Sequence, residues 1–336
     1  MSAKTYPPSF TELALKAKRA LIIGIGGGGD VIQSIPMGNY LKLLGVEELI
    51  VGGVGSAWWM PEGDPVSKDP SAMTFGPTAY DVHELEPSRA WANGIVGVES
   101  ATHHRGRRPA EAVLAHLLPG EPFIASLRNG AVGLRDALAA VIADRKIDIV
   151  VAVDIGSDSF HDGNEVIRAQ TSLVDFIGLA ALTQLDVPVV YSLAGYGSDG
   201  EMQLEELDER VARVMKGGGY LGAIGLTHRD VDEMLAACAL YPDPIEHYSA
   251  LAARGEFGFK RVQTASPWGS SVKITPLAAT VLIFDPRVMV REACVGVELL
   301  KATTSLAEAE EIYANALGQI PETRLAPYLR FMKPSA

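Results

Sequence analysis

Short apolar runs alternate with longer amphipathic runs from Ala20 to about Leu226, and this alternation is the feature that most restricts the fold. It is typical of βαβ units, in which helices connect parallel strands. We expect strands at Ala20–Ile25, Leu49–Val54, Pro122–Leu127, Ile147–Val153, Val187–Leu193 and Leu221–Leu226. We expect helices at Val31–Leu44, Ala131–Arg145, Ser172–Gln184 and Leu204–Lys216. Residues 1–336 are therefore predicted to form a single elaborated α/β domain, Rossmann-like and doubly wound, with a mostly parallel sheet.

Several segments depart from this alternation, and after one of them the chain returns to an apolar strand at Leu277–Phe284. Residues 55–108 include the pair Trp58-Trp59 and several prolines, and we predict a lid-like, irregular excursion over the sheet edge. Flexible linkers seldom carry adjacent tryptophans, so an ordered segment is favoured over a linker. Residues 287–336 are predicted to be a helical tail, in which Ser305 and Glu308 have the spacing of a capping box.

The first expected strand runs directly into a glycine-rich loop. Without side chains, the N–H groups of such a loop can approach a phosphate or carboxylate at the start of the next helix. The sequence fits the dinucleotide pattern GxGxxG, although four consecutive glycines satisfy many patterns. A tight turn that binds no ligand is the alternative. The cofactor-binding candidates in this loop are Gly26, Gly27, Gly28, Gly29 and Asp30.

Three further cofactor-binding candidates follow other expected strands. Ser56 follows the second strand and is placed to accept a phosphate, while Arg128 and Asn129 follow the third. An arginine at this edge can bind a phosphate or carboxylate. An equally good interpretation makes Asn129 a helix cap beside a solvent-exposed Arg128.

Two acidic loops follow the fourth and fifth strands. They read Asp154-Ile-Gly-Ser-Asp158-Ser-Phe-His161-Asp162-Gly-Asn164-Glu165 and Gly195-Tyr-Gly-Ser-Asp199-Gly-Glu201. Because the carboxyl ends of parallel strands share one edge, we expect both loops to converge with the glycine loop, where open α/β sheets bind ligands.

Converging carboxylates that lack a matching Lys or Arg repel one another, and a divalent cation with oxygen ligands relieves that repulsion. The sequence therefore predicts Mg²⁺ or Mn²⁺ bound by Asp154, Asp158 and Asp199. The catalytic candidates, which would move a proton, are Glu165, Glu201 and His161. The alternative is that most of these acids cap helices or form Asx turns.

Charge and composition restrict the partners. A net charge of -12 argues against nucleic acid as a partner, because the phosphates would be repelled. The sequence has no apolar run that could cross a bilayer and no secretory leader, so we expect a cytoplasmic protein without a membrane partner. The expected partner is a small anionic or nucleotide-like ligand, and a homo-oligomer is compatible with the sequence.

The glycine run from Gly24 to Val31 and the two acidic loops, taken in this order, resemble the DUF1152 family of proteins of unknown function. The order extends to Thr280–Pro286 and a helical tail, so the resemblance covers most of the chain. It implies a Rossmann-like α/β fold and a cytoplasmic protein of archaeal or bacterial type, and it implies no activity. The family pattern Asp-x-Gly-Gly-Asp has a glycine where this chain has Ser157, and Asp154 and Asp158 stay in register.

Three functions fit these features. The first is a metal-assisted enzyme acting on a small phosphorylated or nucleotide-like substrate, by transfer, hydrolysis or elimination. The second is an NAD(P)-dependent oxidoreductase. The second strand lacks the acid that would bind the ribose hydroxyls of NAD, whereas Ser56 leaves NADP open. The third is a non-catalytic nucleotide-binding or sensing protein.

Overall fold

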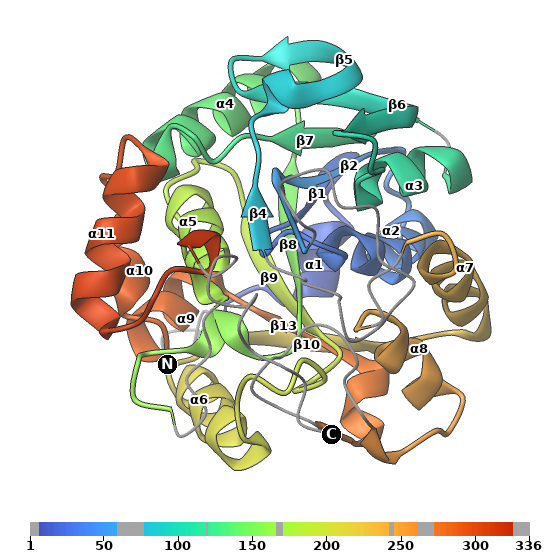
Figure 1. The fold of residues 1–336 in the computed structure, drawn as a ribbon. Coiled ribbons are helices and arrows are strands. Elements are labelled where there is room, and N and C mark those ends of the chain that lie inside the picture. Colours follow the sequence, from blue (N-terminus) through green and yellow to red (C-terminus); the bar gives the residue numbers. More distant parts are fainter. Residues whose placement is uncertain are drawn as a thin grey trace, which may run out of the picture.

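The computed structural model describes residues 7–58, 77–118, 120–165, 171–241, 245–260 and 272–324, and within them nine strands form one central sheet (Figure 1). These strands are β1 (Arg19–Gly24), β2 (Glu48–Val54), β5 (Leu85–Ala92), β6 (Ile95–His104), β7 (Phe123–Ala125), β8 (Ile149–Ile155), β9 (Val189–Ala194), β10 (Tyr220–Gly225) and β13 (Thr280–Phe284). Their order across the sheet is β10-β13-β9-β8-β1-β2-β7-β6-β5.

The five central strands, β7, β2, β1, β8 and β9, are parallel. The chain passes from β1 outward to β2 and β7, and then returns to β8 on the other side of β1. The connections that leave β1 and β8 therefore run in opposite directions, which opens a crevice at the carboxyl ends of these two strands. This arrangement confirms the predicted Rossmann-like, doubly wound and mostly parallel sheet.

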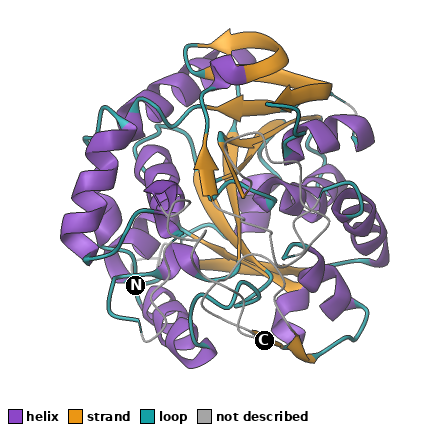
Figure 2. Ribbon diagram, in the orientation of Figure 1, coloured by secondary structure: helices purple, strands orange, loops and turns teal. Residues whose placement is uncertain are grey.

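Helices cover both faces of the sheet (Figures 1 and 2). On one face lie α4 (Gly130–Arg145), α5 (Ser172–Leu182), α6 (Leu204–Lys216), α9 (Pro286–Glu292), α10 (Gly296–Leu300) and α11 (Leu306–Leu317). On the other lie α1 (Phe10–Ala14), α2 (Ser34–Leu43), α3 (Ala110–Leu117) and α7 (His228–Cys238). The remaining helix, α8 (His247–Ala253), packs on α7. No helix among the described residues is both long enough and apolar enough to span a membrane.

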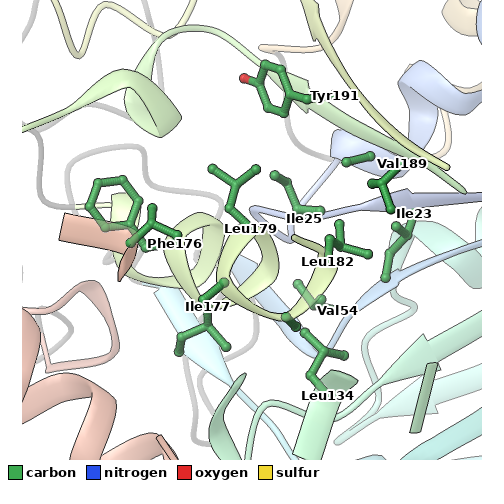
Figure 3. Packing of buried hydrophobic residues seen from close by; sticks show 14 of the residues in the cluster. Ile23, Ile25, Val54, Leu134, Phe176, Ile177, Leu179, Leu182, Val189 and Tyr191 are labelled. Carbon is green, nitrogen blue, oxygen red and sulfur yellow. The ribbon is translucent and has the colours of Figure 1, made fainter. Parts of the chain in front are cut away.

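Successive side chains of a strand point to opposite faces of the sheet, and this explains why the core has two sides. In β1, Leu21 and Ile23 join the apolar cluster under α4 and α5, whereas Ala20 and Ile22 join the cluster on the opposite face. Successive strand residues point to opposite faces, so a strand covered on both sides is apolar throughout. Every residue of α5 is buried, and its apolar side chains pack against neighbours that include Ile23, Val54 and Leu134 (Figure 3).

The structure corrects two details of the predicted sheet. Although β9 and β10 run in the same direction, they are not neighbours, because β13 lies between them and pairs antiparallel with both. Part of the predicted irregular excursion at residues 55–108 is regular, because β5 and β6 form an antiparallel hairpin that extends the sheet from β7. Antiparallel edge strands need no crossover helix, so the βαβ rhythm does not reveal them.

The rest of the excursion contains the two-stranded pair β3 (Ser56–Trp58) and β4 (Pro77–Ala79), while residues 59–76, including Trp59, lie outside the described residues. A second pair, β11 (Gly258–Lys260) and β12 (Val272–Ile274), follows α8. The described part of the predicted tail, residues 287–324, consists mostly of α9, α10, α11 and the 3₁₀ turn η6 (Glu322–Arg324). Residues 325–336 lie outside the described residues.

Candidate functional site

The glycine loop connects β1 to a 3₁₀ turn, η1 (Asp30–Gln33), which leads into α2. Gly27 and Gly28 have φ angles of 81° and 57°, in the left-handed region that favours glycine. The Gly28 N–H donates to the Ser56 carbonyl at 2.8 Å, and the Gly26 N–H donates to the Asp30 carboxylate at 2.7 Å. The loop is thus tied to the end of β2 and to its own aspartate, which fixes its shape.

A pocket opens at the carboxyl ends of β1 and β8, where the crevice was expected. It encloses about 520 Å³ when the open space at its mouth is counted. No Lys or Arg is among the described residues that line it, whereas six carboxylates are. The lining residues are Gly26, Gly27, Gly28, Gly29, Asp30, Ser56, Ile155, Asp158, Thr171, Asp199, Glu201, Ile245, Glu246 and Glu322.

Three buried aspartates, which we call the inner carboxylates, meet beside the glycine loop: Asp30, Asp154 and Asp175. Each offers an oxygen that lies within 4.8 Å of an oxygen of the other two. Asp154 accepts hydrogen bonds from the hydroxyls of Tyr191, at 2.6 Å, and Ser159. Burial raises the pKa of Asp154, and the two hydroxyl donors oppose this shift. Burial and then the charges of neighbouring acids raise the pKa of Asp175 well above its ordinary value.

Three further acids that line the pocket, which we call the outer carboxylates, are held by hydroxyl groups: Asp158, Asp199 and Glu201. Asp199 accepts the Ser157 N–H at 2.8 Å and the Ser157 hydroxyl at 2.9 Å. The Thr171 hydroxyl lies 3.1 Å from Asp158 Oδ2 and also contacts Glu201 Oε2. One hydroxyl carries one proton, so it can donate to only one of these two carboxylates at a time.

Burial raises the pKa of Glu201 to about 8, and the charge of Asp199 adds to the effect. Burial also raises the pKa of Asp199 to about 6, although its bonds from Ser157 oppose the shift. Burial, and then the charges of neighbouring acids, also raise the pKa of Asp158 well above its ordinary value. The two carboxyls that share the Thr171 hydroxyl therefore both favour the protonated form more than an exposed acid does.

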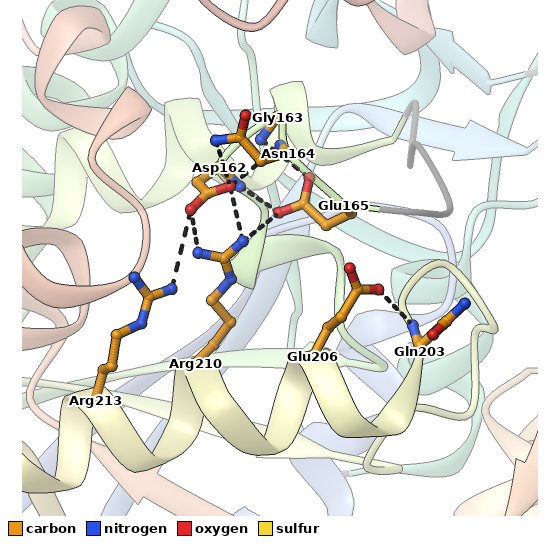
Figure 4. A network of polar contacts seen from close by, with 8 residues as sticks. All are labelled: Asp162, Gly163, Asn164, Glu165, Gln203, Glu206, Arg210 and Arg213. Atoms are coloured by element: carbon orange, nitrogen blue, oxygen red, sulfur yellow. Dashed lines mark hydrogen bonds and ion pairs between the residues drawn. The ribbon is translucent and has the colours of Figure 1, made fainter.

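Two of the predicted catalytic residues do not line this pocket. His161 is fully buried, and burial lowers the pKa of its ring to about 3, so the ring is neutral at physiological pH. Glu165 accepts the Asp162 N–H at 2.7 Å and binds Arg210 at 3.2 Å (Figure 4). Burial raises the pKa of Glu165. In Asp162 burial acts in the same direction, but the contacts with Arg210 and Asn164 together outweigh it and lower the pKa. We interpret this ion-pair network as structural support for the acidic loop.

Arg128 and Asn129 also lie outside the pocket lining. The Arg128 guanidinium is exposed and donates to Asp81 at 2.9 Å. Asn129 is exposed at the start of α4, and its side chain makes no capping hydrogen bond. Of the predicted cofactor-binding residues, the structure therefore gathers the glycine loop, Asp30 and Ser56.

Three acids in or beside the pocket were missed by sequence reasoning. Asp175 interrupts the otherwise apolar α5, and this isolated charge is the signal that could have revealed it. Glu246 precedes α8 and lies so close to the glycine loop that a Cβ on Gly29 would be 1.8 Å from its Oε1. Glu322 comes from the tail and accepts the N–H groups of Leu173 and Val174 at 2.9 and 2.8 Å, at the start of α5. We find no sequence signal for Glu246 or Glu322.

No curated protein and no solved structure matches the chain. A family model described as "Protein of unknown function (DUF1152)" matches residues 21–325, a range that contains the glycine loop, both acidic loops and Glu322. The resemblance that the three motifs indicated is therefore confirmed, and the chain belongs to the DUF1152 family.

Proposed function

We propose that the protein is a metal-assisted enzyme that acts on a small phosphorylated or nucleotide-like molecule. One observation carries the proposal. Six carboxylates line the pocket at the carboxyl ends of β1 and β8, and no Lys or Arg is among its described lining residues. Buried carboxylates this close cannot all ionise without a counter-charge. Mg²⁺ or Mn²⁺ supplies that charge through oxygen ligands, and it typically keeps further positions for water or substrate phosphates.

The acids around the glycine loop favour a ligand that binds together with a metal. A bare phosphate at this loop would meet the carboxylates of Asp30 and Glu246, which repel it when they are ionised. A cation between the carboxylates and the phosphate would turn this repulsion into attraction, while the loop contributes backbone dipoles at the start of η1. The same acids disfavour a dinucleotide that binds through its pyrophosphate alone, so the NAD(P)-dependent oxidoreductase is the second candidate.

Glu201 is the acid–base group that the pocket supports best. Its carboxyl lines the pocket, contacts the Thr171 hydroxyl and has a pKa near the physiological range. A group with such a pKa can both donate and accept a proton at neutral pH. This property suits protonation of a leaving group as well as activation of a water or hydroxyl, and therefore transfer, hydrolysis or elimination.

The proposal is tested first by binding. The melting temperature of the full chain is measured in EDTA, MgCl₂ and MnCl₂, each with and without ADP, ribose 5-phosphate or NADP⁺. We expect either metal to raise the melting temperature, because a ligand selective for the folded state stabilises it. A further rise with ADP or ribose 5-phosphate should require the metal. An unchanged melting temperature in both metals would contradict the proposal, and stabilisation by NADP⁺ in EDTA would favour the oxidoreductase.

Turnover separates the enzyme from a sensing protein. Phosphorylated metabolites and nucleotides are incubated with the metal-loaded protein, and the products are followed by ³¹P NMR and mass spectrometry. Metal-dependent product formation that Glu201→Gln slows on the order of a hundredfold supports the enzyme. Metal-dependent binding of a ligand that is recovered unchanged would support the non-catalytic alternative. An Arg128→Ala variant serves as the control, because this exposed side chain pairs with Asp81 outside the pocket lining.

A further inference from the structure

We propose that one divalent cation, Mg²⁺ or Mn²⁺, binds to the inner carboxylates, with Asp175 of α5 as a direct ligand beside Asp30 and Asp154. This inference rests on the proposed function, because it identifies the metal site that the function requires. It replaces the ligand set predicted from the acidic loops, Asp154, Asp158 and Asp199, and it retains only Asp154.

The spacing of the inner carboxylates suits a small cation. Oxygens bound to Mg²⁺ in octahedral geometry at about 2.1 Å lie about 3 Å apart when adjacent and about 4.2 Å apart when opposite. One oxygen from each inner carboxylate already lies within 4.8 Å of the other two.

Asp175 provides the second argument, because one of its two carboxylate oxygens lacks a partner. Its side chain is fully buried in a mostly apolar helix; Oδ1 accepts the Ser159 hydroxyl at 3.3 Å, whereas Oδ2 has no hydrogen-bond partner among the described residues. An unpaired polar atom in such surroundings costs free energy, so a purely structural role would favour an apolar residue. A cation between Asp175 and Asp154 would satisfy this oxygen.

Gly26 leaves the space in which the carboxylates meet. A Cβ at this position would lie 2.6 Å from Asp175 Oδ1, 2.9 Å from Asp175 Oδ2 and 2.7 Å from Asp30 Oδ2. The backbone therefore approaches these oxygens more closely than any residue with a side chain would permit. Because Asp30 also lines the pocket, a cation at the inner carboxylates would lie next to the substrate space.

Asp199 and Asp158 of the outer carboxylates are bound by hydrogen-bond donors of the acidic loops and of Thr171. Ser157 supplies both its N–H and its hydroxyl to Asp199, while Asp158 accepts the Ser159 N–H at 3.1 Å and faces the Thr171 hydroxyl. On Asp154, the hydroxyls of Tyr191 and Ser159 act as the outer partners that orient a metal-binding carboxylate. The site thus divides into inner carboxylates that hold the metal and outer carboxylates that shape the pocket and move protons.

The test measures Mn²⁺ binding to the full chain by calorimetry and by the loss of the free Mn²⁺ signal in electron paramagnetic resonance. The variants are Asp175→Asn and, as the matched comparison from the outer carboxylates, Asp199→Asn. We expect the wild type to bind one Mn²⁺, Asp175→Asn to bind at least tenfold more weakly, and Asp199→Asn to stay within about threefold. Melting in EDTA adds a second readout: Asp175→Asn should be at least as stable as the wild type, because it removes a buried carboxyl from the cluster, but it should gain little from MnCl₂.

Each other outcome overturns the inference in a recognisable way. If the wild type binds Mn²⁺ and Asp175→Asn binds it equally well, the assigned ligand is wrong while the proposed function stands. If only Asp199→Asn loses binding, the metal belongs to the outer carboxylates. If the wild type binds no Mn²⁺, the inner carboxylates hold protons instead, and the inference and the proposed function fail together. Should Asp175→Asn fail to fold, Asp30→Asn takes its place, because Asp30 belongs to the inner set alone and its amide oxygen can still accept the Gly26 N–H.

Discussion

Replacing Gly26 by alanine tests whether the space beside the inner carboxylates is needed for metal binding. The new Cβ would lie 2.6 Å from an Asp175 oxygen and 2.7 Å from an Asp30 oxygen. Ordinary contacts begin near 3.4 Å, so the carboxylates have to retreat by about 0.8 Å, or the loop has to move. Gly26 is outside the left-handed region, and alanine therefore adds no backbone strain of that kind.

The size of the expected effect follows from this displacement. Metal–oxygen distances tolerate deviations of about 0.2 Å, so a shift of about 0.8 Å disrupts the ligand set. We expect Mn²⁺ affinity to fall at least tenfold, which corresponds to about 1.4 kcal/mol. Overpacking typically costs about 1–3 kcal/mol of stability. For a chain of 336 residues, this corresponds to a decrease of about 1–4 °C in melting temperature.

Calorimetry with MnCl₂ and thermal melts in EDTA measure the two effects separately. Gly225→Ala is the matched control, because Gly225 lies in β10, has no positive φ, and a Cβ added there would meet no atom within 4 Å. A Gly26→Ala protein with the Mn²⁺ affinity of the wild type would refute the argument that this glycine keeps the metal site open. Equal losses in both glycine variants would indicate a general effect of the substitution on the sheet.

Three further changes give separable outcomes. Glu201→Gln should lower turnover on the order of a hundredfold while ligand affinity stays within a few-fold, because the amide keeps the shape of the side chain but cannot transfer the proton. Unchanged turnover would leave Glu201 only the role of binding the Thr171 hydroxyl. Glu111→Gln should remove a pH dependence of stability, because burial raises the pKa of Glu111 to about 8 in the folded protein. The folded state keeps that proton while the unfolded state releases it above about pH 4.5, so the wild type should lose about 2–3 kcal/mol relative to the variant between pH 5 and 7. Urea unfolding measures this difference, and parallel pH profiles would contradict it. Arg210→Met should lower the free energy of unfolding by about 3–5 kcal/mol, because the buried Glu165 loses its counter-charge. The Mn²⁺ affinity should stay unchanged. A loss of Mn²⁺ binding without a loss of stability would assign Arg210 to the metal site instead.

The sequence by itself determined the parallel strands at the centre of the sheet and the edge that carries the site. The expected strand at Ile147–Val153 corresponds to β8, and the expected helix at Leu204–Lys216 has the observed bounds of α6. These elements are encoded locally, because the period of apolar residues differs between strands and helices. Once the strands are parallel, the glycine loop and the acidic loops must share one edge, and so Gly26, Asp158 and Glu201 could be placed at one pocket.

The tertiary structure alone decided which strands became neighbours and which acids meet. The insertion of β13 between β9 and β10 depends on pairing between distant segments, which no local pattern specifies. Within one acidic loop, Asp154 at the end of β8 reaches the inner carboxylates, whereas Glu165 turns to Arg210. Residues on a loop share no fixed periodicity, so their directions follow from the hydrogen bonds and packing of the whole fold. The same reason explains Asp175, whose charge was readable in the sequence as an anomaly in an apolar helix, but whose partners became known only when α5 was packed beside the glycine loop.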